Sequence, residues 1–139
     1  MISSSPRTII PFIILIVIFD QATKFLALRY LHTVCNRGIA FGLLPDFANV
    51  VISVAVVLIV GSLLTRSLLV KRGGSSFGSV GLSLILAGGV SNLIDRLVRG
   101  CVVDFVNLRI WPAFNLADSL ICIGVGLLVI VLVLKGENK

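Results

Sequence analysis

Two aspartates beside apolar segments are the strongest candidates for chemistry in this sequence. Asp104 follows the end of one apolar segment, and Asp118 lies one helical turn into the next. If these segments are antiparallel neighbouring helices, the short link between them brings both carboxylates to a similar depth. Two adjacent carboxylates do not readily ionise together, so they tend to share one proton. The ionised member can then activate water while the protonated member polarises a peptide carbonyl, as in an aspartic peptidase.

Polar clusters from other segments are expected at the same face. Asparagine amides can hydrogen-bond carboxylates or a substrate backbone without adding charge, and small residues leave room for a substrate. We interpret Asp20 with Lys24, and Asp95 with Arg96 or Arg99, as structural ion pairs. The expected supporting or substrate-binding residues are Asp20, Lys24, Asn36, Gly38, Asn92, Asp95, Arg96, Asn115 and Ala117.

Other catalytic chemistries find little support. His32 is the only histidine, Cys35 lacks an evident base, and the acids show no metal-ligand spacing. We therefore expect no metal and no organic cofactor. The sequence leaves a disulfide between Cys35 and Cys101 open but does not favour it, because nothing fixes their geometry. Cys122, inside an apolar run, is interpreted as a buried small side chain.

The composition is that of a membrane protein. Of the 139 residues, 58% are hydrophobic and 13% are charged, about half the charged fraction of a typical soluble domain. Four apolar runs are each long enough to cross a bilayer, and only helices satisfy their own backbone groups there. The sequence predicts one all-α domain over 1–139, a bundle with spans at about 9–31, 48–70, 77–97 and 113–134.

Charge and topology narrow the partners and the orientation. The net charge is +6, but the basic residues occur singly, which argues against nucleic acid and suits lipid head groups. The first span resembles a secretory signal without a cleavage site, so we interpret it as retained; a cleaved signal is the alternative. Lys and Arg are almost evenly divided between the two sides. We place both termini in the cytoplasm.

Five motifs in order resemble those of the lipoprotein signal peptidases, the bacterial type II signal peptidases. They cover the chain from the first span to the start of the fourth. The matched residues are Asp20, Gln21 and Lys24; Asn36, Gly38, Ala40, Phe41 and Gly42; Asn92, Leu93, Asp95 and Arg96; Val102, Asp104 and Phe105; and Phe114, Asn115, Ala117 and Asp118.

This resemblance implies a specific activity. Such enzymes cleave diacylglyceryl-modified prolipoproteins before the lipidated cysteine, near the outer face of the bacterial cytoplasmic membrane. Their catalytic aspartates correspond to Asp104 and Asp118. They also carry a small extracytoplasmic β-structured element after the segment matched at Phe41, and the peptide globomycin inhibits them. We expect a monomer whose partners are these prolipoproteins and membrane lipid.

Departures and rival interpretations remain. Ser91 stands where the family usually has Gly, and Ile39 replaces a common Ala. The loop after Phe41 is short, which affects the region that binds substrate in the family. The two aspartates could instead cap helix starts. A proton-coupled transporter would place polar groups at several depths and often contain a repeat, which we do not find. A scaffold protein would tolerate Asp-to-Asn changes at both positions.

Overall fold

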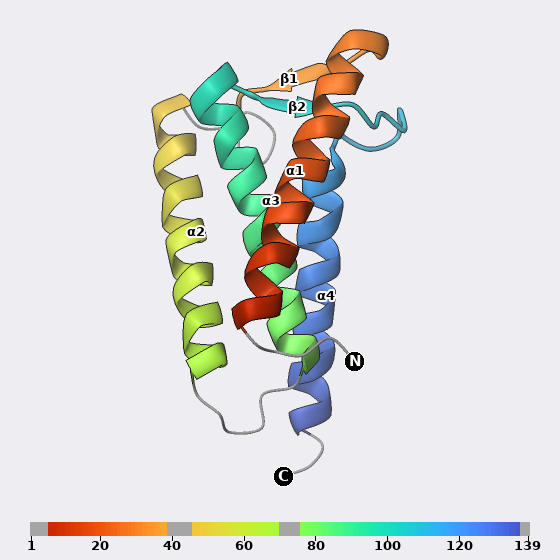
Figure 1. Ribbon diagram of the computed structural model, residues 1–139. Helices are drawn as coiled ribbons and strands as arrows, with labels where there is room; N and C mark the ends of the chain where they lie inside the picture. The colour runs from red at the N-terminus through yellow and green to blue at the C-terminus, as the bar shows by residue number, and fades with distance from the viewer. Residues whose placement is uncertain (1–5, 39–45, 70–75, 137–139) are drawn as a thin grey trace.

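The computed structural model describes residues 6–38, 46–69 and 76–136, which form four long helices and two short strands (Figure 1). In chain order the elements are α1 (Pro6–Tyr30), β1 (Val34–Asn36), α2 (Asp46–Leu69), α3 (Ser76–Arg99), β2 (Val102–Asp104) and α4 (Leu116–Gly136). Each helix is long and apolar enough to cross a membrane. The predicted four-helix bundle with a small β-structured element is confirmed.

The bundle is organised around α3, which packs against each of the other three helices. In its apolar span 44% of residues are buried, against 11–17% in the other three spans. Large apolar side chains such as Leu58, Ile130 and Leu132 point outward, and polar groups such as Ser83 and Asp95 are enclosed. This distribution suits lipid, which solvates apolar surface, and requires enclosed polar groups to find partners.

Cys122 is exposed on the outer surface of α4, so the expectation that it is buried is wrong. In an apolar helix the sequence does not separate the interior face from the lipid face, because both accept a small apolar side chain.

Two glycine contacts bring α3 and α4 close together. A Cβ placed on Gly88 would lie 2.6 Å from the carbonyl oxygen of Ala117, and one placed on Gly124 would lie 2.6 Å from that of Gly81. In both helices the paired positions are separated by two helical turns, so they lie on one face. This close approach fixes the height of the first turn of α4 against α3.

The strands β1 and β2 form an antiparallel sheet at the end of the bundle away from the start of α1 (Figure 1). Val34 pairs with Asp104, and Asn36 pairs with Val102. The sequence placed the β-structured element after Phe41, and residues 39–45 lie outside the described part. The described sheet instead joins segments on either side of α2 and α3, and it contains Asp104.

The glycine contacts can be tested by adding a single methyl group. Gly88→Ala should destabilise the protein by about 1–3 kcal/mol, because the backbone of α4 must move to admit the new Cβ. Gly126→Ala is the matched control, since a Cβ placed there would meet no atom within 4 Å apart from its own stretch of helix backbone. Thermal unfolding in detergent measures both; equal midpoints for the two variants would show that the close approach does not matter.

Candidate active site

A buried ammonium group lies at the centre of the polar end of the bundle. Lys24 Nζ is 2.8 Å from Asp20 Oδ2 and 2.9 Å from Asp95 Oδ2, and all three side chains are inaccessible to solvent. It also donates a hydrogen bond to Asn92 Oδ1 at 2.9 Å. An ammonium has three donors, so its hydrogen-bonding capacity is filled. Lys24 therefore joins α1 to two successive turns of α3.

Asp95 has further partners that complete this network. Its Oδ1 accepts from Arg99 and, at 2.9 Å, from Gln21 Nε2, while Arg99 also donates to Gln21 Oε1 at 3.0 Å. Of the two arginines expected to pair with Asp95, the structure selects Arg99. With Asp20 and Lys24 the network holds two acids and two bases. Its charges balance, as buried ions require.

Asp20 also reaches the first turn of α4. Its Oδ1 accepts the backbone N–H of Ala117 at 2.8 Å, and its Oδ2 accepts the hydroxyl of Ser91 at 2.6 Å. The first N–H groups of a helix lack partners within the helix. A carboxylate from α1 supplies one here, so the ion network fixes where α4 begins.

Asn115 and Asp118 form a reciprocal cap at the start of α4. Asn115 Oδ1 accepts the Asp118 N–H at 3.0 Å, and Asp118 Oδ2 accepts the Asn115 N–H at 3.1 Å. This is the capping-box arrangement, with Asp in the position usually held by Glu or Gln. The expectation that Asp118 could cap a helix is therefore met, and its other oxygen accepts the Asn92 amide at 2.8 Å.

Asp104 is held by two amide groups at the end of β2. Its Oδ2 accepts from Asn36 Nδ2 at 3.0 Å and its Oδ1 accepts from Asn115 Nδ2 at 2.8 Å, and the residue is only 1% exposed. Burial raises the pKa of the Asp104 carboxyl above its usual value; the Asn36 hydrogen bond opposes the increase, and the nearby Asp118 charge adds to it.

The link between β2 and α4 turns back on itself and brings the two aspartates together. Val106 and Phe114 form a bridge, with backbone hydrogen bonds of 2.9 and 3.1 Å between them. Asn115 follows this bridge directly and contacts both aspartates, one through its side chain and the other through its backbone. The expected approach of Asp104 to Asp118 thus depends on a closed loop as well as on helix packing.

A cavity of about 310 Å³ opens beside Asp118. Asn36, Gly38, Asn92 and Arg96 line its polar side. The buried Nε of Arg96 has no hydrogen-bond partner within the described residues. Gly38 donates its N–H to Asn36 Oδ1 at 3.1 Å, which orients the Asn36 amide toward Asp104. Trp111, Pro112, Ala113 and Phe114 line the cavity from the loop before α4.

The structure thus brings most of the predicted site residues together, but not all of them at the cavity. Ala117 is fully buried beside α3, Asp104 is 1% exposed, and neither residue lines the cavity. Ala40, which could leave room for substrate, lies outside the described residues. Three polar residues are missing from the predicted set. Gln21 and Ser91 join the ion network, and Asn49 donates to the Arg37 carbonyl at 2.7 Å. For Ser91 and Asn49 the available signal is a polar residue beside apolar ones, and for Gln21 it is the position next to Asp20.

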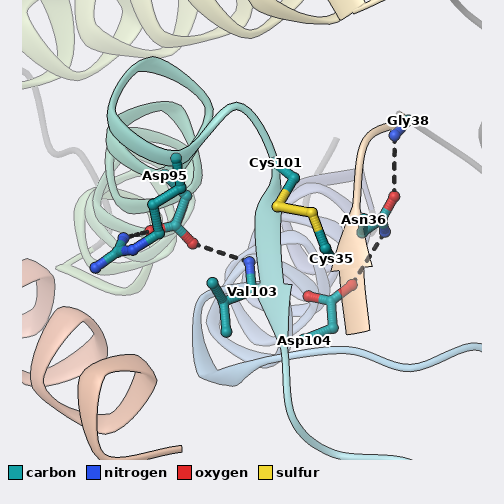
Figure 2. The surroundings of a disulfide bond; sticks show 8 residues. Cys35, Asn36, Gly38, Asp95, Cys101, Val103 and Asp104 are labelled. Atoms are coloured by element: carbon teal, nitrogen blue, oxygen red, sulfur yellow. Dashed lines mark hydrogen bonds and ion pairs between the residues drawn. A yellow bond between two sulfur atoms is a disulfide. The ribbon is translucent and has the colours of Figure 1, made fainter. Parts of the chain in front are cut away.

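The structure contains a disulfide between Cys35 and Cys101, so the expectation that did not favour it is wrong (Figure 2). The pairing of β1 with β2 supplies the geometry that the sequence could not show. Their Cα atoms are 5.5 Å apart, within the range that a disulfide spans.

Comparison with known proteins assigns the family. A family model described as signal peptidase (SPase) II matches residues 12–134. The chain belongs to the signal peptidase II family. It is therefore a peptidase, and its four apolar helices make it a multi-pass membrane protein.

Curated relatives and solved structures agree with this family. A lipoprotein signal peptidase of Halothermothrix orenii is 36% identical over 135 residues, covering 86% of this chain and 91% of the relative. One from Burkholderia mallei is 36% identical, with coverages of 84% and 81%. A bacterial membrane enzyme solved by the in meso method at 2.3 Å resolution superposes with a TM-score of 0.80 at 30% identity, covering 96% of this chain and 92% of its own.

The buried ammonium at the centre of this peptidase can be tested by removing its charge. Lys24→Met should destabilise the protein by roughly 3–5 kcal/mol, because Asp20 and Asp95 would stay buried with a charge left unpaired. Arg29→Met, at an exposed position of the same helix, is the control and should change stability little. Unfolding by heat or denaturant in detergent compares them. A Lys24→Met midpoint equal to that of Arg29→Met would contradict the central role of Lys24.

Proposed function

We propose that this protein is an aspartic endopeptidase that removes signal peptides from diacylglyceryl-modified prolipoproteins by cleaving before the lipidated cysteine. The observation that carries the proposal is the hydrogen bonding of Asn115 to both Asp104 and Asp118. It joins two carboxyl groups from different elements in one hydrogen-bond network, and Asp118 lines the cavity. The names of the curated relatives support the substrate class.

The two aspartates have different surroundings, which supports different roles. Asp104 is enclosed and burial raises its pKa, so we assign it the role of the proton donor to the carbonyl oxygen of the substrate. Asp118 is half-buried and lines the cavity, so it takes a proton from water as the water oxygen attacks the carbonyl carbon. When the C–N bond breaks, Asp118 gives that proton to the leaving amine, and Asp104 recovers its own proton from the hydroxyl that becomes the new carbonyl oxygen.

Polar groups of the cavity wall suit a peptide backbone. Arg96 presents donors beside Asp118, and its buried Nε is without a partner among the described residues. Gly38 and Asn92 line the same wall. We assign substrate positioning to these three groups. Asp20, Lys24 and Asp95 hold the framework without contacting substrate, and the reaction requires neither a metal nor an organic cofactor.

We also propose that the site lies at the outer face of the bacterial cytoplasmic membrane, with both termini in the cytoplasm. The Cys35–Cys101 disulfide supports this orientation, since disulfides persist in oxidising compartments and are rare in the cytosol. The substrate's lipid tails would then lie in the bilayer beside the bundle. We further propose that the enzyme acts as a monomer and is inhibited by globomycin.

A transporter fits the structure less well. Asp20, Lys24, Asp95 and Asp104, the buried charged side chains within the described ranges, all lie at one end of the bundle. Ser79 and Ser83 are buried nearer the other end of α3, but they are uncharged, and the Ser83 hydroxyl donates to the Ser79 carbonyl of the same helix. A proton-coupled path would place ionisable groups at several depths.

Asp104→Asn and Asp118→Asn should each abolish cleavage of a diacylglyceryl-modified prolipoprotein, with a loss of about 10³-fold or more, as for removal of other essential catalytic groups. Each variant keeps the shape of the side chain, so unfolding midpoints near that of the wild type serve as the control. A scaffold protein would tolerate both changes. Normal cleavage by both folded variants would therefore refute the dyad.

The pH profile tests the role of Asp104. An enzyme loses activity as pH rises through the pKa of its proton donor. Asp104 therefore sets the high-pH side, or basic limb, of the pH–activity profile. Since the Asn36 hydrogen bond lowers that pKa, Asn36→Ala should raise it further and move the basic limb to higher pH. Asn107→Ala removes an exposed amide that contacts only the backbone of Arg109 among the described groups, and it should leave the limb in place. A shift of the Asn36→Ala limb to lower pH would contradict the assignment.

A further inference from the structure

We propose that the Cys35–Cys101 disulfide holds β1, and with it the Asn36 amide, against Asp104, so that the enzyme is active when this bond is formed and slow when it is reduced. The inference rests on the proposed function, because it concerns the activity of the same dyad. It assigns a role to two cysteines that the five family motifs do not include.

The disulfide and the catalytic hydrogen bond lie on opposite faces of the same two strands. Cys35 is paired with Val103, and Cys101 immediately precedes β2. Because side chains alternate along a strand, Asn36 and Asp104 project from the other face, where their hydrogen bond of 3.0 Å forms. Figure 2 shows the disulfide and the Asn36–Asp104 hydrogen bond as two links between the same strands. One is covalent, and the other holds the reacting carboxyl.

β2 has supports other than β1. The backbone N–H of Val103 donates to Asp95 Oδ2 at 3.2 Å, which ties β2 to the buried ion network (Figure 2). Beyond β2, the bridge between Val106 and Phe114 closes the link to α4. Asp104 is therefore anchored to the bundle from both sides along its own segment.

β1 has fewer supports in the described part of the chain. It has only three residues and pairs with β2 alone, and a sheet of two short strands is marginally stable by itself. Besides this pairing, the Asn36 amide and the disulfide, the Arg37 carbonyl accepts from Asn49 at 2.7 Å. Cleaving the disulfide would let β1 move away from β2 and carry the Asn36 amide away from Asp104.

The bond is accessible to a reducing agent from one side. Cys35 is exposed, whereas Cys101 is 5% exposed. A dithiol would attack Cys35 Sγ, release the Cys101 thiolate and then close to its own disulfide. Two electrons and two protons pass to the cysteines, which become thiols. An extracytoplasmic protein disulfide would reverse the step by exchange.

The test compares oxidised and dithiothreitol-reduced enzyme, purified in detergent, on a diacylglyceryl-modified prolipoprotein. Alkylation and mass measurement report the state of the cysteines. Reduction should lower kcat by about 10-fold or more, because small misplacements of catalytic groups cost rates of this order. Reoxidation should restore it. Cys122→Ser is the matched control and should respond like the wild type, since Cys122 lies outside the disulfide. Cys35→Ser/Cys101→Ser should be slow and insensitive to reduction.

Positioning is separated from general stability by a double-mutant cycle. If the disulfide acts through the Asn36 amide, reduction should lower the activity of Asn36→Ala much less than that of the wild type, and reduced wild type should show a basic limb moved to higher pH. If reduction lowers the activity of both proteins by the same factor, the disulfide does not act through the Asn36 amide. Unchanged kcat in reduced wild type would overturn the inference altogether, while an inert oxidised wild type would refute the proposed function instead.

Discussion

The structure depends on a single buried ammonium group that satisfies three acceptors from two helices. Lys24 lies between Asp20 and Asp95 and also holds Asn92, so α1 and α3 are joined at one level of the bundle. A low-dielectric interior strengthens these contacts and makes any missing partner costly. The network therefore specifies one relative height and rotation of the two helices. Apolar side chains that face lipid specify this height and rotation less sharply, because one helix can slide along another without losing a particular partner.

The two proposed catalytic aspartates are positioned by backbone hydrogen bonds as much as by side-chain contacts. Asp20 accepts an N–H from the first turn of α4, and Asp95 accepts one from β2. The two elements that carry Asp118 and Asp104 are thus attached to the same ion network. Asn115 then joins the two aspartates directly. The framework and the dyad form one continuous set of hydrogen bonds, in which the helix cap is also part of the proposed catalytic machinery.

The sequence predicted the parts of this arrangement that depend on local spacing. Length and periodicity predict the four apolar helices, the ion pair of Asp20 with Lys24 within one helix, and the approach of Asp104 to Asp118. The pairing of β1 with β2 could not be predicted, because strands of three residues carry almost no periodic signal and their cysteines are 66 residues apart. The disulfide was missed for the same reason. Cys122 was misplaced because lipid and protein interior select similar side chains. Ser91 was noted only as a departure, because its partners come from α1.

The spacing of the buried charges also bears on how the chain enters the bilayer. Asp20 and Lys24 are four residues apart on α1, and Asp95 and Arg99 are four residues apart on α3. Each helix therefore carries its own neutral pair during insertion, before the other helix is available. A lone charge at this depth would oppose transfer from the translocon into lipid. When the helices meet, Lys24 gains Asp95 as a second partner, and the pairs within each helix become the contact that joins α1 to α3.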